Sequence, residues 1–119
     1  MKKSFVQGPI PAEKIAKSIA HHKHKTNIGA HDIFLGQVRE DLIGDLSVIS
    51  IDFEAQEELS EKTIYEIREE AFANFSLTCL HIYHSLQNVP VGELCFYVFA
   101  SSSHRDAAFN ATRYIVEEF

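Results

Sequence analysis

A run of hydroxyl and basic side chains offers the clearest chemistry in this sequence. Ser101, Ser102 and Ser103 are followed directly by His104 and Arg105, where an apolar run gives way to a helical pattern. The free N–H groups of a helix N-terminus favour an anion, arginine can hold a phosphate or carboxylate through two hydrogen bonds, and histidine can move a proton near neutral pH. The segment is therefore a candidate anion site. The alternative is an ordinary helix cap beside an exposed His–Arg pair, and from these residues alone this alternative is favoured.

Arg39 is the second candidate for anion binding. It follows an expected core strand and opens a polar loop, a common position for a binding arginine. The alternative is an exposed arginine that pairs with Glu40 or Asp41, and from these residues alone this alternative is favoured.

The histidines do not form a convincing metal site. His21, His22 and His24 are close in sequence, but no carboxylate or cysteine joins them at ligand spacing. They are predicted to be the solvated end of a helix, where basic residues suit the negative end of the helix dipole. His81 and His84 are expected on opposite faces of a strand, one exposed and one partly packed.

Composition limits the remaining classes of function. The chain has 119 residues, enough for one domain, and a formal net charge of −6, which argues against binding to bulk nucleic acid. No apolar run approaches the roughly 20 residues of a membrane helix, and no signal peptide follows the basic start. Cys79 and Cys95 lie inside apolar runs and are predicted to be buried, reduced thiols. We therefore expect a cytoplasmic protein.

The elements that must position these residues follow from hydrophobic periodicity and turn signals. The predicted order is a helix over 12–22, strands over 30–38 and 48–54, a helix over 57–75, strands over 77–83 and 93–101, and a final helix that reaches residue 119. This α-β-β-α-β-β-α order predicts a single α+β domain, with helices packed on a mixed or antiparallel sheet.

Several local features make this prediction more specific. The apolar residues of 57–75 recur at helical spacing, and the strand over 93–101 is apolar on both faces and therefore expected at the centre of the sheet. Gly36 suggests a bulge or a close backbone approach in its strand, and 88–92 is expected to be a turn. Ser103 and Asp106 have the spacing of a capping box.

Four short motifs occur in an order that is informative as a set. They are Gly29-Ala30 leading into Ile33-Phe34-Leu35-Gly36-Gln37-Val38-Arg39; Phe53-Glu54-Ala55; Gly92-Glu93; and Ser102-Ser103-His104-Arg105 with Ala107-Ala108-Phe109. The combination resembles the large, catalytic subunit of molybdopterin synthase, whose sequences carry Gly-x-Val-Arg and Ser-x-His-Arg-x-x-Ala-Phe in this order. The resemblance runs over about 28–119.

The resemblance implies a sulfur-transfer enzyme without a bound cofactor or metal. Such an enzyme installs two sulfurs on cyclic pyranopterin monophosphate, and the sulfur arrives as a thiocarboxylate on the C-terminal Gly-Gly of a small ubiquitin-like partner. The family forms a homodimer of large subunits with a small subunit at each end, and its pocket is shared across the dimer. By resemblance, Arg39, His104 and Arg105 are assigned to catalysis and, with Ser102 and Ser103, to substrate binding.

Two departures from the family pattern are visible. Ser85 and Gln87 stand where the family usually has Arg and Gly. The family's catalytic lysines lie in a segment after the last helix, and no lysine of this sequence can be carried over to it, since the sequence ends at Phe119. We expect a lysine-containing tail beyond this residue. The alternative is a non-catalytic module of the same fold that binds an anion or a partner.

Overall fold

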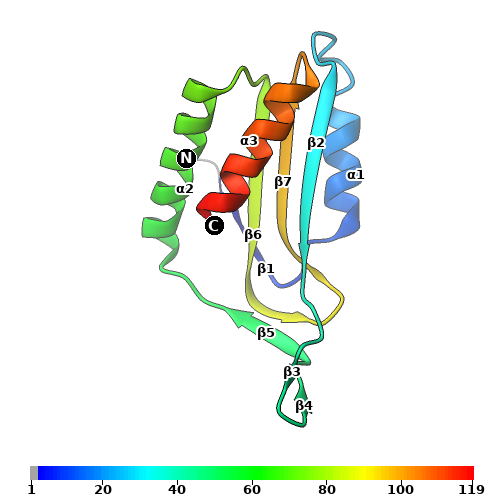
Figure 1. Ribbon diagram of the computed structural model, residues 1–119, viewed down its shortest axis with the longest axis vertical. Helices are drawn as coiled ribbons and strands as arrows, with labels where there is room; N and C mark the ends of the chain where they lie inside the picture. Colours follow the sequence, from blue (N-terminus) through cyan, green and yellow to red (C-terminus); the bar gives the residue numbers. More distant parts are fainter. Residues whose placement is uncertain (1–2) are drawn as a thin grey trace.

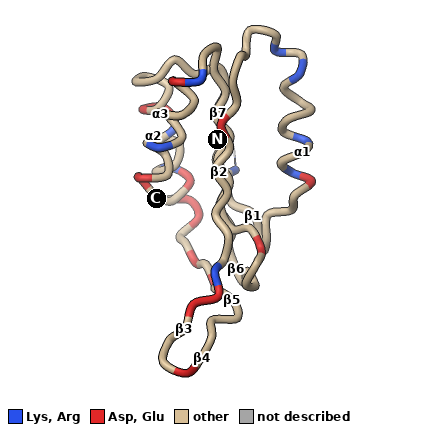
Figure 2. The backbone as a smooth tube through the Cα atoms, turned by 45° about the vertical axis from the view of Figure 1, so that its right-hand side comes forward, with Lys and Arg blue, Asp and Glu red and all other residues tan. Residues whose placement is uncertain are grey.

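A mixed sheet of five strands forms the middle layer of the molecule. The computed structural model describes residues 3–119, with α1 on one face of the sheet and α2 and α3 on the other (Figures 1 and 2). The elements are β1 (Phe5–Gln7), α1 (Ala12–His21), β2 (Ala30–Gln37), β3 (Leu42–Ile43), β4 (Leu46–Ser47), β5 (Ser50–Phe53), α2 (Glu57–Asn74), β6 (Cys79–Pro90), β7 (Leu94–Ser102) and α3 (Arg105–Glu118). The predicted α+β fold is confirmed.

Strand β7 lies at the centre of the sheet, as its apolar sequence predicts. It pairs antiparallel with β2 on one side and with β6 on the other, while β1 pairs parallel with β6. The register of β2 shifts between Gly36 and Gln37, which confirms the predicted bulge. A Cβ on Gly36 would lie 2.9 Å from Cβ of Phe96, so the absence of a side chain allows the two strands to approach.

Alternation along β7 divides the core between the two faces of the sheet. Phe96, Val98 and Ala100 face α2 and α3, whereas Tyr97 and Phe99 face α1. Helices α2 and α3 meet the first face with the apolar stripes that their spacing predicts, whereas α1 has no buried residue and Ile19 of its predicted stripe is exposed. On the first side these include Ile64 and Ala71 of α2 and Ala111 and Ile115 of α3, all buried. The central strand is thus buried on both sides because both layers of helices cover it.

Three features extend beyond the predicted elements. Strand β1 is added at the sheet edge beside β6, and the polar loop after Arg39 contains the short β3–β4 hairpin, which turns at Gly44 and Asp45. Strand β6 continues to Pro90 because its last four residues pair with β5. The predicted turn over 88–92 is therefore shorter, with Gly92 in the left-handed region at φ +89°.

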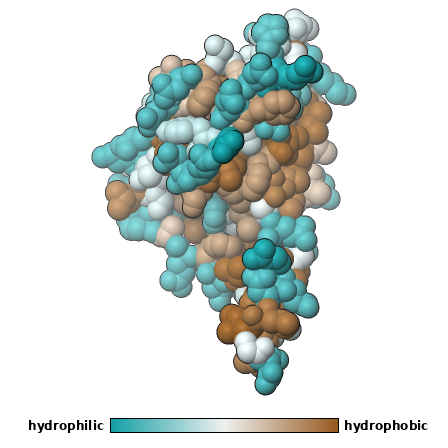
Figure 3. All heavy atoms as spheres, in the orientation of Figure 1, coloured by the Kyte–Doolittle hydropathy of each residue, from teal (hydrophilic) through white to brown (hydrophobic). Residues whose placement is uncertain are grey.

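The prediction for the segment 48–54, which contains β5, is only partly correct. Alternation predicts Ile49, Ile51 and Phe53 on one half-buried face, but Ile49 is 79% exposed and Ile51 is also exposed. Within residues 3–119, only the Phe53 end of this face is covered, where the Phe53 ring packs against His84. Together with the hairpin, the rest of this face forms an apolar projection, which appears at the lower end of the molecule (Figure 3).

The prediction of a solvated histidine cluster at the end of α1 is wrong for His22. Its side chain is buried, its ring lies 5.0 Å from the ring of Phe99, and its Nε2 lies 3.3 Å from Nε2 of His81. Sequence spacing does not reveal this contact, because it depends on how the helix packs on the sheet. Within residues 3–119, no helix combines the length and apolarity needed to cross a bilayer.

Candidate functional site

The predicted anion-binding segment links β7 to α3. Ser101 and Ser102 end the strand and are fully buried, whereas Ser103, His104 and Arg105 are exposed at the start of the helix. The N-terminus of the fourteen-residue α3 gives this position a positive potential. Exposed imidazole and guanidinium groups beside it make an anion site chemically reasonable.

Gly29 holds this segment close to the start of β2. Its N–H donates to the Ser102 carbonyl at 2.9 Å, and a Cβ at this position would lie 2.1 Å from the Ser103 carbonyl oxygen. Any side chain here would push the two backbones apart. The Gly29-Ala30 motif therefore has a direct role in placing His104 and Arg105.

The predicted capping box does not form. His104 is the N-cap residue, and no side chain accepts a hydrogen bond from the first turn of α3. The helix begins at Arg105, so Ser103 lies before the cap position, and the Ser102 hydroxyl instead donates to the His104 carbonyl. This bond fixes the backbone of His104 and leaves N–H groups of the first turn open to a ligand.

Arg39 lies at the other end of β2. Val38 is buried, its N–H donates to the Glu93 carbonyl and its carbonyl accepts from Gly92, so the backbone before Arg39 is held firmly. The guanidinium is exposed and makes two hydrogen bonds to the Asp41 carboxylate, at 2.7 and 3.3 Å. Arg39 therefore forms the ion pair with Asp41 that was the alternative to an anion-binding role.

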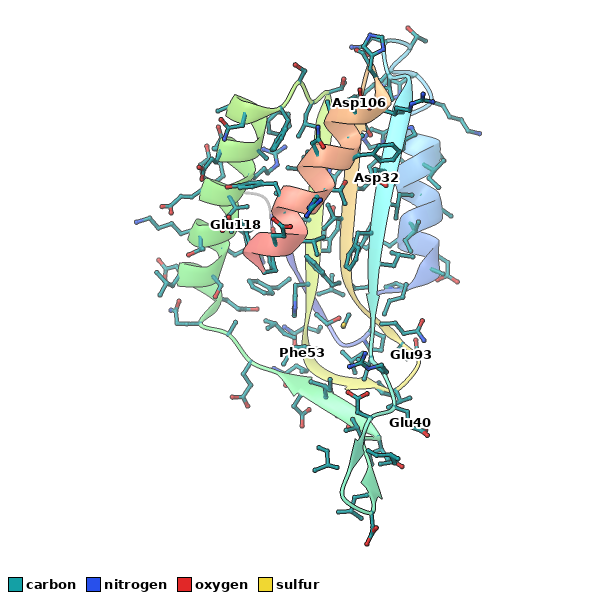
Figure 4. The ribbon with its side chains drawn as sticks, in the orientation of Figure 1. Asp32, Glu40, Phe53, Glu93, Asp106 and Glu118 are labelled. Carbon is teal, nitrogen blue, oxygen red and sulfur yellow. The ribbon has the colours of Figure 1, made fainter. Side chains whose placement is uncertain are left out.

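Within one chain the two candidate clusters do not meet. Ala30 pairs with Ser102, and Gln37 pairs with Leu94 at the opposite end of the strand. Eight residues of extended strand separate the ends by roughly 25 Å. Figure 4 shows this separation through their labelled neighbours, Asp106 at the start of α3 and Glu40 at the base of the hairpin.

A groove that the sequence did not single out lies on the α2 side of the sheet. It has a volume of about 340 Å³ and is mostly apolar. Its lining includes Phe53, Glu54 and Ala55, the second of the four motifs, together with His84 and Phe119. Phe53 and Glu40 lie toward the same end of the sheet (Figure 4). The groove is therefore at the Arg39 end of the molecule.

His84 is the polar side chain on the sheet wall of this groove. Its ring packs against Phe53 and Phe119, with centroid distances of 5.1 and 6.5 Å. Its Nδ1 lies 2.8 Å from the Ser85 carbonyl, so in neutral imidazole Nδ1 carries the proton and Nε2 carries the lone pair. Spacing alone gave His84 no special role; the aromatic residues that enclose it come from distant segments.

Both cysteines are free. Cys79 is buried, as predicted, whereas Cys95 is only half-buried. Burial raises the pKa of the Cys95 thiol, so this group is not activated as a nucleophile. Within residues 3–119, no group of three or more His, Cys, Asp or Glu side chains is arranged to hold a metal ion.

The geometry defines an α+β domain with two separate cationic positions, one at a helix N-terminus and one at a strand end. The sequence profile described as MoaE protein matches residues 6–119, and the chain belongs to this family. The predicted family is thus confirmed.

Relatives and solved structures agree with this assignment. The chain is 36% identical over 93 residues to a protein of Pyrococcus abyssi named "Molybdopterin synthase catalytic subunit", covering 78% of this chain and 62% of that protein. It is 32% identical over 106 residues to a Culex quinquefasciatus protein of the same name, covering 88% and 64%. The chain thus spans about half to two-thirds of the length of these curated relatives.

The fold is shared with molybdopterin synthase structures. The crystal structure of molybdopterin synthase from Staphylococcus aureus superposes with a TM-score of 0.83 at 25% identity, covering 98% of this chain and 82% of that one. A complex of subunits 1 and 2 of molybdopterin-converting factor from Helicobacter pylori gives 0.82 at 22% identity, covering 98% and 75%.

Proposed function

We propose that this chain acts as the large subunit of a molybdopterin synthase. It would transfer sulfur from the thiocarboxylated C-terminus of a small ubiquitin-like partner to cyclic pyranopterin monophosphate. The observation that carries the proposal is the family match together with the exposed basic side chains of Arg39, His104 and Arg105. Its free cysteines fit a reducing compartment, so we place the protein in the cytoplasm.

The substrate pocket is proposed to form between two copies of the chain. Arg39 and the His104–Arg105 pair lie at opposite ends of β2, too far apart for both to contact one pterin phosphate. In a symmetric dimer, Arg39 of one copy can meet His104 and Arg105 of the other, and the same contact is then made twice.

The apolar projection is the surface proposed to join the copies. Leu42, Ile43, Leu46 and Ile49 are each between 71% and 79% exposed, and they are adjacent to Arg39 in the chain. An apolar surface of this kind is typical of a homodimer interface. Covering it would place Arg39 next to the second copy, as the shared pocket requires.

The groove beside His84 is proposed to receive the partner's C-terminal tail. A Gly-Gly end has no side chains and so suits this mostly apolar groove, which lies at the Arg39 end of the molecule. The substrate phosphate would be held by Arg105 and the N-terminus of α3, where Ser103 exposes its hydroxyl and the Ser102 hydroxyl steadies the backbone. His104 could donate a proton to the reacting pterin.

Complementation between two inactive variants tests the shared pocket. The Arg39→Ala and Arg105→Ala variants are expressed from the full native gene and purified. Each is expected to remain folded but to lose binding of the pterin phosphate. When they are mixed and allowed to exchange, half of the dimers are mixed, and each has one intact pocket. Calorimetry should therefore recover about a quarter of the wild-type binding sites.

Sulfur transfer is measured on the same samples with the thiocarboxylated partner. Recovery of activity in parallel with binding supports the enzyme. Binding without transfer in the wild-type protein would identify a non-catalytic module of the same fold. If the mixture binds no substrate, the pocket is not shared between copies, and if both single variants bind normally, the residue assignment is wrong.

A further inference from the structure

Positive charge is concentrated on the α1 side of the sheet, the face opposite α3. The stretch 12–30 contains four lysines and three histidines but one acidic residue, Glu13, although the whole chain has a net charge of −6. Figure 2 shows basic residues on α1 and the loop after it, and mostly acidic residues on α2 across the sheet. Helix-dipole complementarity does not explain this, because Lys14 and Lys17 lie in the first two turns of α1.

Strand β6 meets these basic residues in a regular series. Alternate residues of β6 face α1, and each of three contacts a different basic side chain. The Nζ of Lys14 lies 4.1 Å from the centroid of the Tyr83 ring. The Nε2 atoms of His22 and His81 are 3.3 Å apart. The Nζ of Lys25 lies 2.9 Å from the Sγ of Cys79. We call this arrangement the basic seam.

A pocket of about 280 Å³ opens along the seam. Helical spacing places residues 14, 17, 18, 21 and 22 on one stripe of α1, and this stripe forms one wall, opposite His81 and Tyr83. None of the described residues that line the pocket carries a carboxylate. The pocket therefore has several hydrogen-bond donors with positive charge and no built-in counter-ion.

Hydrogen bonding determines which nitrogen atoms of His22 and His81 donate and which accept. His22 Nδ1 lies 2.6 Å from the Ser18 carbonyl, so it must donate, and the lone pair of neutral His22 is on Nε2. His81 then donates to that nitrogen. On strand β2, which lies beyond β7, the pKa of His31 is lowered by burial and by the charge of His22. Positive charges in this region thus repel one another unless an anion is bound.

We propose that the basic seam is a second anion site, which binds a small dianion of the phosphate type, either free phosphate or a phosphate monoester. Lys14 and Lys17 supply ammonium donors, and His21 adds an imidazole at the pocket rim. Charge-assisted hydrogen bonds to a compact dianion would offset the repulsion within the cluster. The site is on the opposite face of the sheet from α3, so it is separate from the proposed pterin pocket.

Nuclear magnetic resonance of the imidazole and backbone signals tests the proposal. The full-length protein is titrated with inorganic phosphate, and separately with glycerol 3-phosphate, at constant ionic strength. We expect saturable shifts at His22, His81 and the amides of α1. Tighter binding of the ester assigns the site to organic phosphates, and tighter binding of phosphate assigns it to the free ion.

Matched charge variants locate the binding. Lys17→Gln is expected to weaken it about tenfold, and Lys14→Gln provides a second variant within the seam. Lys62→Gln removes the same charge from exposed α2 and should have no effect, as should Arg105→Ala at the proposed pterin pocket. This last variant separates failure of the seam from failure of the proposed function.

The effect of pH on the seam is measured with sulfate as the ligand, because sulfate remains a dianion between pH 6 and 8. The charged or titratable groups around His22 are Lys14, Lys17 and His21 on α1, Lys25 in the loop, His31 on β2, and Cys79, His81 and Tyr83 on β6. Bound sulfate should raise the lowered pKa of His31, because a nearby anion offsets the repulsion from His22. Shifts that do not saturate, that chloride reproduces, or that Lys17→Gln leaves unchanged would overturn the proposal.

Discussion

A methyl group at position 29 should displace the segment that carries His104 and Arg105. In Gly29→Ala the new Cβ would begin 2.1 Å from the Ser103 carbonyl oxygen, about 1 Å closer than such atoms approach in proteins. Relief requires β2 and the segment before α3 to separate, which also weakens the bond from the Gly29 N–H to the Ser102 carbonyl. Overpacking costs about 1–3 kcal/mol and the hydrogen bond about 1 kcal/mol. The free energy of unfolding should therefore fall by about 2–4 kcal/mol.

Urea denaturation measures this loss, and pterin phosphate binding measures its functional consequence. A displacement of about 1 Å at a binding group can weaken function by about a hundredfold. Gly44→Ala is the control: its Cβ would meet nothing within 4 Å, and its cost of about 1 kcal/mol arises only from the left-handed φ of +64°. If Gly29→Ala changes stability by less than about 0.5 kcal/mol and leaves the amide signals of 102–105 unmoved, this account of Gly29 is incorrect.

Four further predictions concern other positions. Gln87 has φ +69°, where the family usually has glycine, so Gln87→Gly should raise the free energy of unfolding by about 1 kcal/mol; a loss of stability would contradict this. Ser85 is fully buried and its hydroxyl has no hydrogen-bond partner, so Ser85→Ala should stabilise by up to about 1 kcal/mol in thermal unfolding. The lowered pKa of His31 means that the native state binds fewer protons there than the unfolded chain, so its contribution to stability is full above about pH 6.5 and is lost as pH falls below that value. His31→Gln should flatten this part of the stability curve, and an unchanged slope would exclude His31 as its source. Leu46→Glu should convert a dimer to monomers in analytical ultracentrifugation, whereas an unaltered dimer would place the interface elsewhere.

The local pattern of the sequence was sufficient for much of the fold. Periods of 3.6 and 2 predicted the three helices and the central position of β7, because each pattern reflects which faces are covered by other layers. The motifs predicted the family correctly. The bulge at Gly36 followed from one residue, since a missing Cβ is a local property that the sequence states directly.

Long-range pairing determined what the sequence could not show. Strand β1 and the second half of β6 form only because distant segments offer hydrogen bonds there, and the apolar pattern near Ile49 does not reveal whether anything in the same chain covers it. The contacts of His22 with His81 and of Lys25 with Cys79 likewise depend on how α1 lies across the sheet.

The candidate site shows the same division. Residue types alone identified Arg39, His104 and Arg105 as groups suited to an anion, because charge and hydrogen-bonding capacity belong to the side chain itself. Only the tertiary structure placed them at opposite ends of β2 and paired Arg39 with Asp41. Their separation is set by the register and length of an extended strand, and both depend on which strands pair across the whole sheet.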